Sequence, residues 1–212
     1  MKKRTAEQWN EVLISCGVKP IFAAKWSSAF AEVIDATSFS TGPSEIDDFL
    51  GQILHESAGL TRMEEHLNYS ADRIRELGNK SPEGSRWRSL VARADALSNN
   101  PVAFANACYG GRMGNAQPGD GFAYRGSGPI MVTGKYNFAE LERVTGIPLV
   151  ASPDLLRRPG PEALRVCIAW WEGHVPDAVM GNIERVRRAV NGGIIGLADT
   201  GRLTQLATEA LA

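Results

Sequence analysis

The residues that could do chemistry lie mainly in one segment, residues 52–70, with the sequence QILHESAGLTRMEEHLNYS. An apolar stripe containing Ile53 and Leu54 leads into Glu56, near the expected end of a helix. A carboxylate there is partly desolvated and lies at the negative end of the helix dipole. Both effects disfavour its charged form, which suits a general acid. The alternative is a solvated glutamate at a frayed helix end, and Glu56 alone favours that alternative slightly.

A second carboxylate changes this balance. On one continuous helix, Glu56 and Glu65 would point in opposite directions at ~100° per residue. The pair Ala58-Gly59 is expected to break the helix, so that the chain can turn and bring Glu65 back across a groove from Glu56. Two carboxyl groups that face each other across a groove are the arrangement for glycoside hydrolysis. A gap of roughly 5–5.5 Å favours retention of configuration, and about 6.5–9.5 Å favours inversion.

Other kinds of catalysis have less support. His55-Glu56 begins the zinc-protease pattern H-E-x-x-H, but the second histidine is replaced by Gly59. We therefore expect no metal site and no cofactor. An amidase or peptidase would need a zinc site or a Cys-His pair, and the nearest candidate nucleophile, Cys108, is expected to be a buried thiol.

The elements that position these side chains are predicted to be mainly helical. A segment dense in glycine, residues 110–129, interrupts the pattern and is expected to form a long functional loop without helix. The run IMVT, residues 130–133, predicts a short strand. Apolar periodicity predicts helices over residues 9–16, 22–34, 46–54 with Ser44 as N-cap, 70–77 with Ser70 as N-cap, 87–97, 101–109, 138–144, 161–173, 182–190 and 198–211.

Composition limits the classes of function. The net charge of −1 is unlike that of a general nucleic-acid binder, so no nucleic-acid partner is expected. The longest apolar run, residues 166–171, is too short to span a bilayer, so no membrane insertion is expected. The N-terminal residues contain no apolar signal core. We expect residues 1–212 to form one catalytic domain, without a separate wall-binding module, that is made in the cytoplasm.

Several motifs together carry a resemblance to a known family. They are HES at 55–57, EEHLNYS at 64–70, YGGRMGN at 109–115, GDGFAYRGSGPIMVTG at 119–134 and NGG at 191–193. With these motifs in this order, the chain resembles the family 19 glycoside hydrolases, a chitinase family that includes many bacteriophage endolysins. It is most similar to the endolysin branch.

The resemblance implies a lysozyme-like, two-lobed helical fold with a small strand element and a Gly-rich loop at the cleft. It also implies inverting hydrolysis of β-1,4 bonds next to N-acetylglucosamine-type sugars, with Glu56 as the general acid and Glu65 as the general base. Glu64 would then be a surface neighbour. The residues expected to contact substrate or hold the attacking water are Thr133, Tyr136, Asn137, Asn191, His55 and Tyr124.

The chain departs from the family pattern G-R-G-x-I-Q at two positions. Ser127 replaces the arginine and Met131 replaces the glutamine, so a polar contact in or near the cleft is lost. These departures motivate an alternative, a catalytically inactive glycan-binding domain, although both glutamates are retained. Arg185, Arg187 and Arg188 are interpreted as a solvated helix face.

The expected substrate is the glycan strand of bacterial peptidoglycan. The absence of a signal core, the lack of a disulfide framework and the endolysin-type motif spacing favour it over chitin. On this hypothesis the protein is a monomeric endolysin that waits in the host cytoplasm, reaches the periplasm after a holin-type protein opens the membrane, and lyses a thin wall. A chitinase that acts on chitin oligomers is the alternative within the same class.

Overall fold

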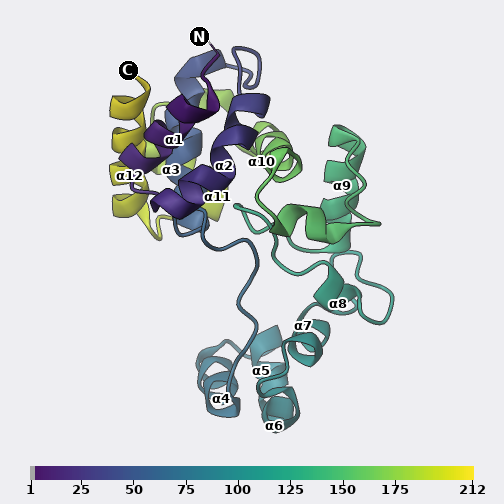
Figure 1. Ribbon diagram of the computed structural model, residues 1–212. Helices are drawn as coiled ribbons and strands as arrows, with labels where there is room; N and C mark the ends of the chain where they lie inside the picture. Colours follow the sequence, from purple (N-terminus) through teal and green to yellow (C-terminus); the bar gives the residue numbers. More distant parts are fainter. Residues whose placement is uncertain (1–2) are drawn as a thin grey trace.

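The computed structural model describes residues 3–212 and is mainly helical, which confirms the predicted fold class (Figure 1). The α-helices are α1 (Ala6–Ser15), α2 (Pro20–Val33), α3 (Ile46–Glu56), α4 (Ala71–Lys80), α5 (Arg86–Leu90), α6 (Ala94–Leu97), α7 (Pro101–Tyr109), α8 (Asp120–Ala123), α9 (Lys135–Thr145), α10 (Pro161–His174), α11 (Ile183–Asn191) and α12 (Leu197–Leu211). Short 3₁₀ helices are η1 (Gly42–Glu45), η2 (Val91–Arg93), η3 (Pro153–Arg157) and η4 (Asp177–Val179).

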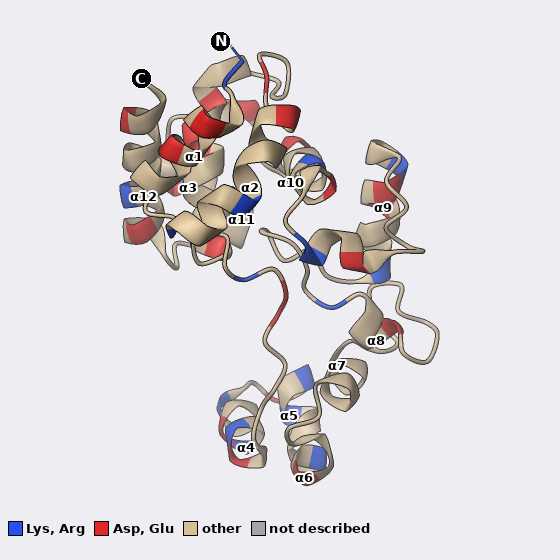
Figure 2. Cartoon of the chain, in the orientation of Figure 1, with Lys and Arg blue, Asp and Glu red and all other residues tan. Residues whose placement is uncertain are grey.

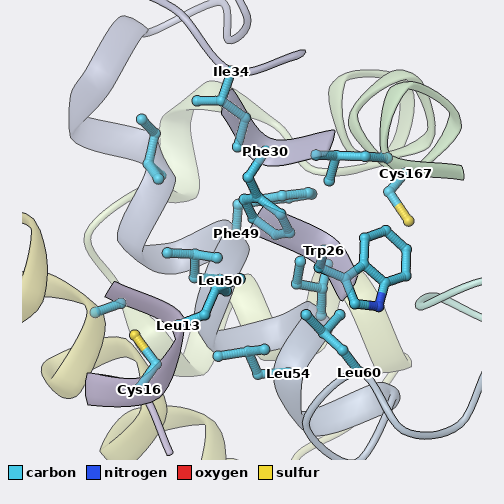
Figure 3. Packing of buried hydrophobic residues seen from close by; sticks show 14 of the residues in the cluster. Leu13, Cys16, Trp26, Phe30, Ile34, Phe49, Leu50, Leu54, Leu60 and Cys167 are labelled. Carbon is cyan, nitrogen blue, oxygen red and sulfur yellow. The ribbon is translucent and has the colours of Figure 1, made fainter. Parts of the chain in front are cut away.

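The largest hydrophobic cluster joins the two ends of the chain. Helices α1, α2 and α3 pack with α10, α11 and α12, as Figure 1 shows at the upper left. Figure 3 shows Trp26, Phe30 and Phe49 among its buried side chains. Helix α3 is buried almost all round, from Ile46 to Leu54, because α12 and α11 also cover it. The helix that ends at Glu56 is therefore held firmly.

Two smaller clusters make up the rest of the molecule. The first lies among α4 to α7, where Tyr69 and Trp87 pack around Phe104. The second lies around α9 and η3 and contains Phe138 and Val132. An extended segment, residues 62–70, leads from the large cluster to the helices of the first small cluster (Figure 1).

Local details differ from the sequence predictions. Ser70 caps α4 as predicted, but Ser44 lies in η1 and α3 begins without a side-chain cap. The predicted strand at residues 130–133 is a tight turn, in which Val132 forms an isolated bridge to Ser127. Backbone pairing within this turn outweighs the local strand preference of the sequence. The Gly-rich loop contains one short helix, α8, although no helix was predicted there.

Within residues 3–212, none of the helices combines the length and the apolar character needed to cross a bilayer. The same residues contain no group of three or more His, Cys, Asp or Glu side chains arranged to hold a metal ion.

Candidate active site

The turn after Glu56 redirects the chain, as the sequence predicted. Ala58, Gly59 and Leu60 all have positive φ values, of 51°, 69° and 61°. Two of these residues carry a Cβ atom, so the left-handed backbone is strained and must be held by other contacts. Ser57 supplies them, since its hydroxyl donates to the Ile53 carbonyl (2.6 Å) and accepts from the Leu60 amide (2.8 Å).

Glu56 is held by an arginine from a distant part of the sequence. Nη1 of Arg187 donates to Oε1 of Glu56 (2.6 Å) and to Oε1 of Gln52 (3.1 Å), one turn earlier in α3. Nε of Arg187 donates to the carbonyl of Ile195 (2.6 Å). The Arg187 side chain is only 1% exposed, whereas that of Glu56 is 24% exposed. The carboxylate is therefore fixed from the inside and open to solvent on its other side.

Arg187 corrects one sequence interpretation. It was assigned to a solvated face of α11 with Arg185 and Arg188, but it is buried against α3. Nothing in the sequence indicates that a buried positive charge lies beside Glu56 and holds its carboxylate.

His55 lies on the other side of the end of α3. Its Nδ1 is 2.7 Å from Oδ2 of Asp199, and Arg202 donates to Oδ1 of the same carboxylate (2.7 Å). The hydrogen bond from His55, followed by that from Arg202, lowers the pKa of Asp199. A Cβ atom on Gly196, which has φ +83°, would lie 2.3 Å from His55 Nε2. Only glycine leaves room for this imidazole ring.

Glu65 is held by the Gly-rich loop rather than by a helix. Its amide donates to the Gly126 carbonyl (2.8 Å), and its Oε2 accepts from the Gly126 amide (3.3 Å). The hydroxyl of Tyr109 donates to its Oε1 (2.5 Å). Burial, followed by this hydrogen bond, raises the pKa of Tyr109, so the phenol stays protonated as a donor. The neighbouring Glu64 points elsewhere and pairs with Arg125 (2.5 Å).

Gly126 also brings Thr133 beside Glu65. A Cβ atom on Gly126 would lie 3.3 Å from Oε2 of Glu65 and 3.4 Å from Oγ1 of Thr133. The two side chains predicted to act on water therefore flank the same glycine. Asn137 supports this arrangement, because its Nδ2 donates to the Thr133 carbonyl (2.8 Å).

The position of Ser127 shows what replaces the arginine of the family pattern. Ser127 is fully buried, and Nε of Arg157 donates to its hydroxyl (2.9 Å). Arg157 also donates to the Ala123 carbonyl (2.5 Å) and pairs with Asp154. A guanidinium from η3 thus supports the loop that carries Gly126.

The remaining predicted substrate residues are placed differently from one another. Tyr136 is 72% exposed at the start of α9, and Asn191 is exposed at the end of α11. Tyr124 does not face the solvent: it is 5% exposed, it packs on Phe138, and its hydroxyl donates to the Val150 carbonyl (2.9 Å). The structure therefore assigns Tyr124 to the core around α9 and not to a sugar-binding surface.

Two hollows open at the carboxylates. One of about 550 Å³ is lined by Glu56, His55 and Asp199, and one of about 460 Å³ is lined by Glu65, Phe122 and Arg125. Arg62 lines both of them. The carboxylates predicted to be catalytic therefore lie at two open hollows that share Arg62 as a lining residue.

Tyr109 and Arg187 are the contacts whose roles the sequence did not reveal. In the sequence, Tyr109 stands out only as the first residue of the motif YGGRMGN, and its spacing from Glu65 gives no local signal. The cysteines follow the sequence prediction, since Cys16, Cys108 and Cys167 are all free and buried. Burial raises the pKa of Cys108, which does not suit a nucleophile.

Comparisons with known proteins agree with this fold. A glycosyl hydrolase family 19 domain-containing protein of Haemophilus influenzae is 31% identical over 157 residues, 73% of this chain and 74% of that protein. Two endochitinases of Arabidopsis thaliana are 31% and 32% identical over 77 and 71 residues, about a quarter of each of those proteins. No protein-family model matches the chain.

A solved structure shows the same fold. The crystal structure of a chitinase C mutant aligns with 98% of this chain and 76% of its own, with a TM-score of 0.58 and 16% sequence identity. Fold and relatives together define the class of protein, a mainly helical glycoside hydrolase. The chain belongs to glycosyl hydrolase family 19.

Proposed function

We propose that this glycoside hydrolase cleaves β-1,4 bonds in the glycan strands of bacterial peptidoglycan by inversion. The observation that carries the proposal is the placement of Glu56 and Glu65 on two solvent-filled hollows that share one lining residue, Arg62. A pair of carboxyl groups beside one scissile bond is the usual equipment of a glycosidase.

Each side chain has a role in this mechanism. Glu56 donates a proton to the leaving oxygen, and Arg187 holds its carboxylate in place. Glu65 accepts a proton from water, while Tyr109 and the Gly126 amide orient its two oxygens. The hydroxyl of Thr133, on the same side of Gly126, holds the water. No cofactor takes part.

The biological role proposed is that of an endolysin. A monomer carries both carboxylates and is sufficient for catalysis. It is released from the host cytoplasm to the periplasm by a holin-type protein and degrades the wall there. The similarity to a glycosyl hydrolase family 19 domain-containing protein of a bacterium, Haemophilus influenzae, supports a bacterial setting for this activity. The second candidate is hydrolysis of chitin oligomers, which the two endochitinase relatives favour.

The decisive experiment is the clearing of outer-membrane-stripped Gram-negative cells, with mass spectrometry of the released fragments. Wild type should clear the suspension and create new reducing ends, whereas folded Glu56→Gln and Glu65→Gln should not. Glu64→Gln is the matched control, since Glu64 is adjacent but pairs with Arg125. Cleaved peptide stems with intact glycan would refute the mechanism, and activity on chitin oligomers alone would favour the second candidate.

A further inference from the structure

Arg62 lies between Glu56 and Glu65 in the sequence and lines the hollow at each of these carboxylates. It follows the left-handed turn after Glu56, and its amide donates to the carbonyl of Ser57 (2.8 Å). Figure 2 shows a basic stretch directly before an acidic stretch in the segment that joins α3 to α4, where Arg62 precedes Glu64 and Glu65. Arg62 lines both hollows, so a glycan strand bound at either carboxylate would pass close to it.

The other arginines of the two hollows have carboxylate partners in the protein. Arg125 pairs with Glu64 (2.5 Å), and Arg202 pairs with Asp199 (2.7 Å). The side chain of Arg62 is exposed, and it forms no hydrogen bond or ion pair with any of residues 3–212. Among the arginines that line these hollows, Arg62 is therefore the one whose charge is available to a ligand.

The two candidate polymers differ in charge where such a group could act. Chitin consists of N-acetylglucosamine alone and is neutral. In peptidoglycan this sugar alternates with N-acetylmuramic acid, whose lactyl group carries a stem peptide with free carboxylates. Because the sugars alternate, one of the two sugars at any scissile bond always bears a lactyl group. A stem carboxylate is thus always near the cleavage point, and arginine binds carboxylates in a planar, two-pronged geometry.

We propose that Arg62 binds a carboxylate of the stem peptide on the muramic sugar next to the scissile bond. This inference rests on the proposed function and names the feature of the substrate that the cleft recognises. Arg62 is a specificity residue in this proposal, because it contacts the substituent and not the reacting atoms. Since the pair is solvent-exposed, we expect a modest gain in affinity, about five- to tenfold, that weakens as salt is added.

The test measures affinity in a Glu56→Gln background, so that cleavage does not interfere. Soluble glycan fragments are prepared with stem peptides and without them, and binding of both is measured by calorimetry. The second kind is made by amidase treatment, after which the lactyl carboxylate that the hydrolysis exposes is converted to an amide, so that no charge remains there. Arg62→Gln should weaken binding of the stem-bearing fragments about five- to tenfold and leave binding of the stripped fragments unchanged. Arg62→Lys should give a smaller loss, because it keeps the charge but not the two-pronged geometry. Arg93→Gln, an exposed arginine on η2, is the matched control and should have no effect.

Every other outcome overturns the inference. An equal loss of affinity for both kinds of fragment would mean that Arg62 acts on the two glutamates or on the cleft itself. Unchanged affinity for the stem-bearing fragments, or no binding of either kind, would mean that Arg62 binds no stem peptide. Failure of the proposed function would be a different result. In that case the wild type would cleave neither peptidoglycan glycan nor chitin oligomers, but the effect of Arg62→Gln on the affinity for stem-bearing fragments could still be measured.

Discussion

Replacing Arg187 by glutamine should weaken both the fold and the activity. Arg187 is buried and donates to three acceptors, Oε1 of Glu56, Oε1 of Gln52 and the carbonyl of Ile195. Glutamine is too short to reach all three of them. The change therefore removes the partner of the proposed acid and one support of the loop after α11.

The expected loss of stability follows from these contacts. A hydrogen bond that involves a charged group contributes ~1.5–3 kcal/mol, and each of these three bonds is donated by a charged guanidinium. The carboxylate of Glu56 is 24% exposed, so it can turn toward water, and its share belongs at the low end of that range. With each bond at the low end of the range, the sum is about 4.5 kcal/mol, which corresponds to a fall in Tm of roughly 9–18 °C for a chain of this size.

Urea unfolding, followed by tryptophan fluorescence, measures the loss. A double-mutant cycle with Glu56→Gln separates the contribution of the pair, because glutamine keeps an oxygen for Arg187 but loses the charge. We expect a coupling energy of about 1–2 kcal/mol. On soluble glycan strands, Arg187→Gln should lower kcat more than it raises KM, because a misplaced acid affects the reaction more than binding.

Two results would refute this reasoning. If Arg187→Gln unfolds within about 0.5 kcal/mol of wild type, the buried contacts do not form in solution. If the cycle gives no coupling energy while stability falls, Arg187 supports the loop but does not hold Glu56. A second variant, Arg187→Lys, keeps a charge and should restore part of the coupling.

The remaining predictions concern three other contacts. Tyr109→Phe removes the hydrogen-bond donor to Glu65 and should lower kcat about tenfold with little change in KM. Steady-state kinetics tests this, and an unchanged kcat would contradict the prediction. Burial raises the pKa of Asp48, so its charged form is disfavoured in the folded protein. Asp48→Asn should therefore raise the free energy of unfolding at pH 7, and the gain should disappear below about pH 3.8, where Asp48 is protonated in both states; pH-dependent urea unfolding tests this. Arg157→Met should lower Tm by several degrees in thermal unfolding, and more than Ser127→Ala, which removes one of its three acceptors.

Much of the helical fold could be predicted from the sequence because local signals define it. The apolar stripe of α3, the glycine after it and the cap at Ser70 act within a few residues, and each is where it was expected. The turn between Glu56 and Glu65 was predictable for the same reason.

The contacts that complete the site were not predictable in this way. Arg187 and Glu56 are separated by 131 residues. Local sequence therefore cannot distinguish this buried arginine from the solvent-exposed arginines on the same amphipathic helix. The family resemblance placed Tyr124, within the Gly-rich segment, at the substrate, but this residue is buried in the hydrophobic cluster around α9. The strand predicted at residues 130–133 failed because its pairing is internal to a turn.

The two carboxylates belong to different parts of the molecule. Glu56 ends a helix packed in the large cluster, whereas Glu65 lies in the extended crossing toward α4 and is tied to the loop at Gly126. A change in spacing between the clusters therefore alters the distance between the carboxyl groups. Inversion needs a gap of about 6.5–9.5 Å, so closure of the molecule around a strand would itself set the distance at which water can attack.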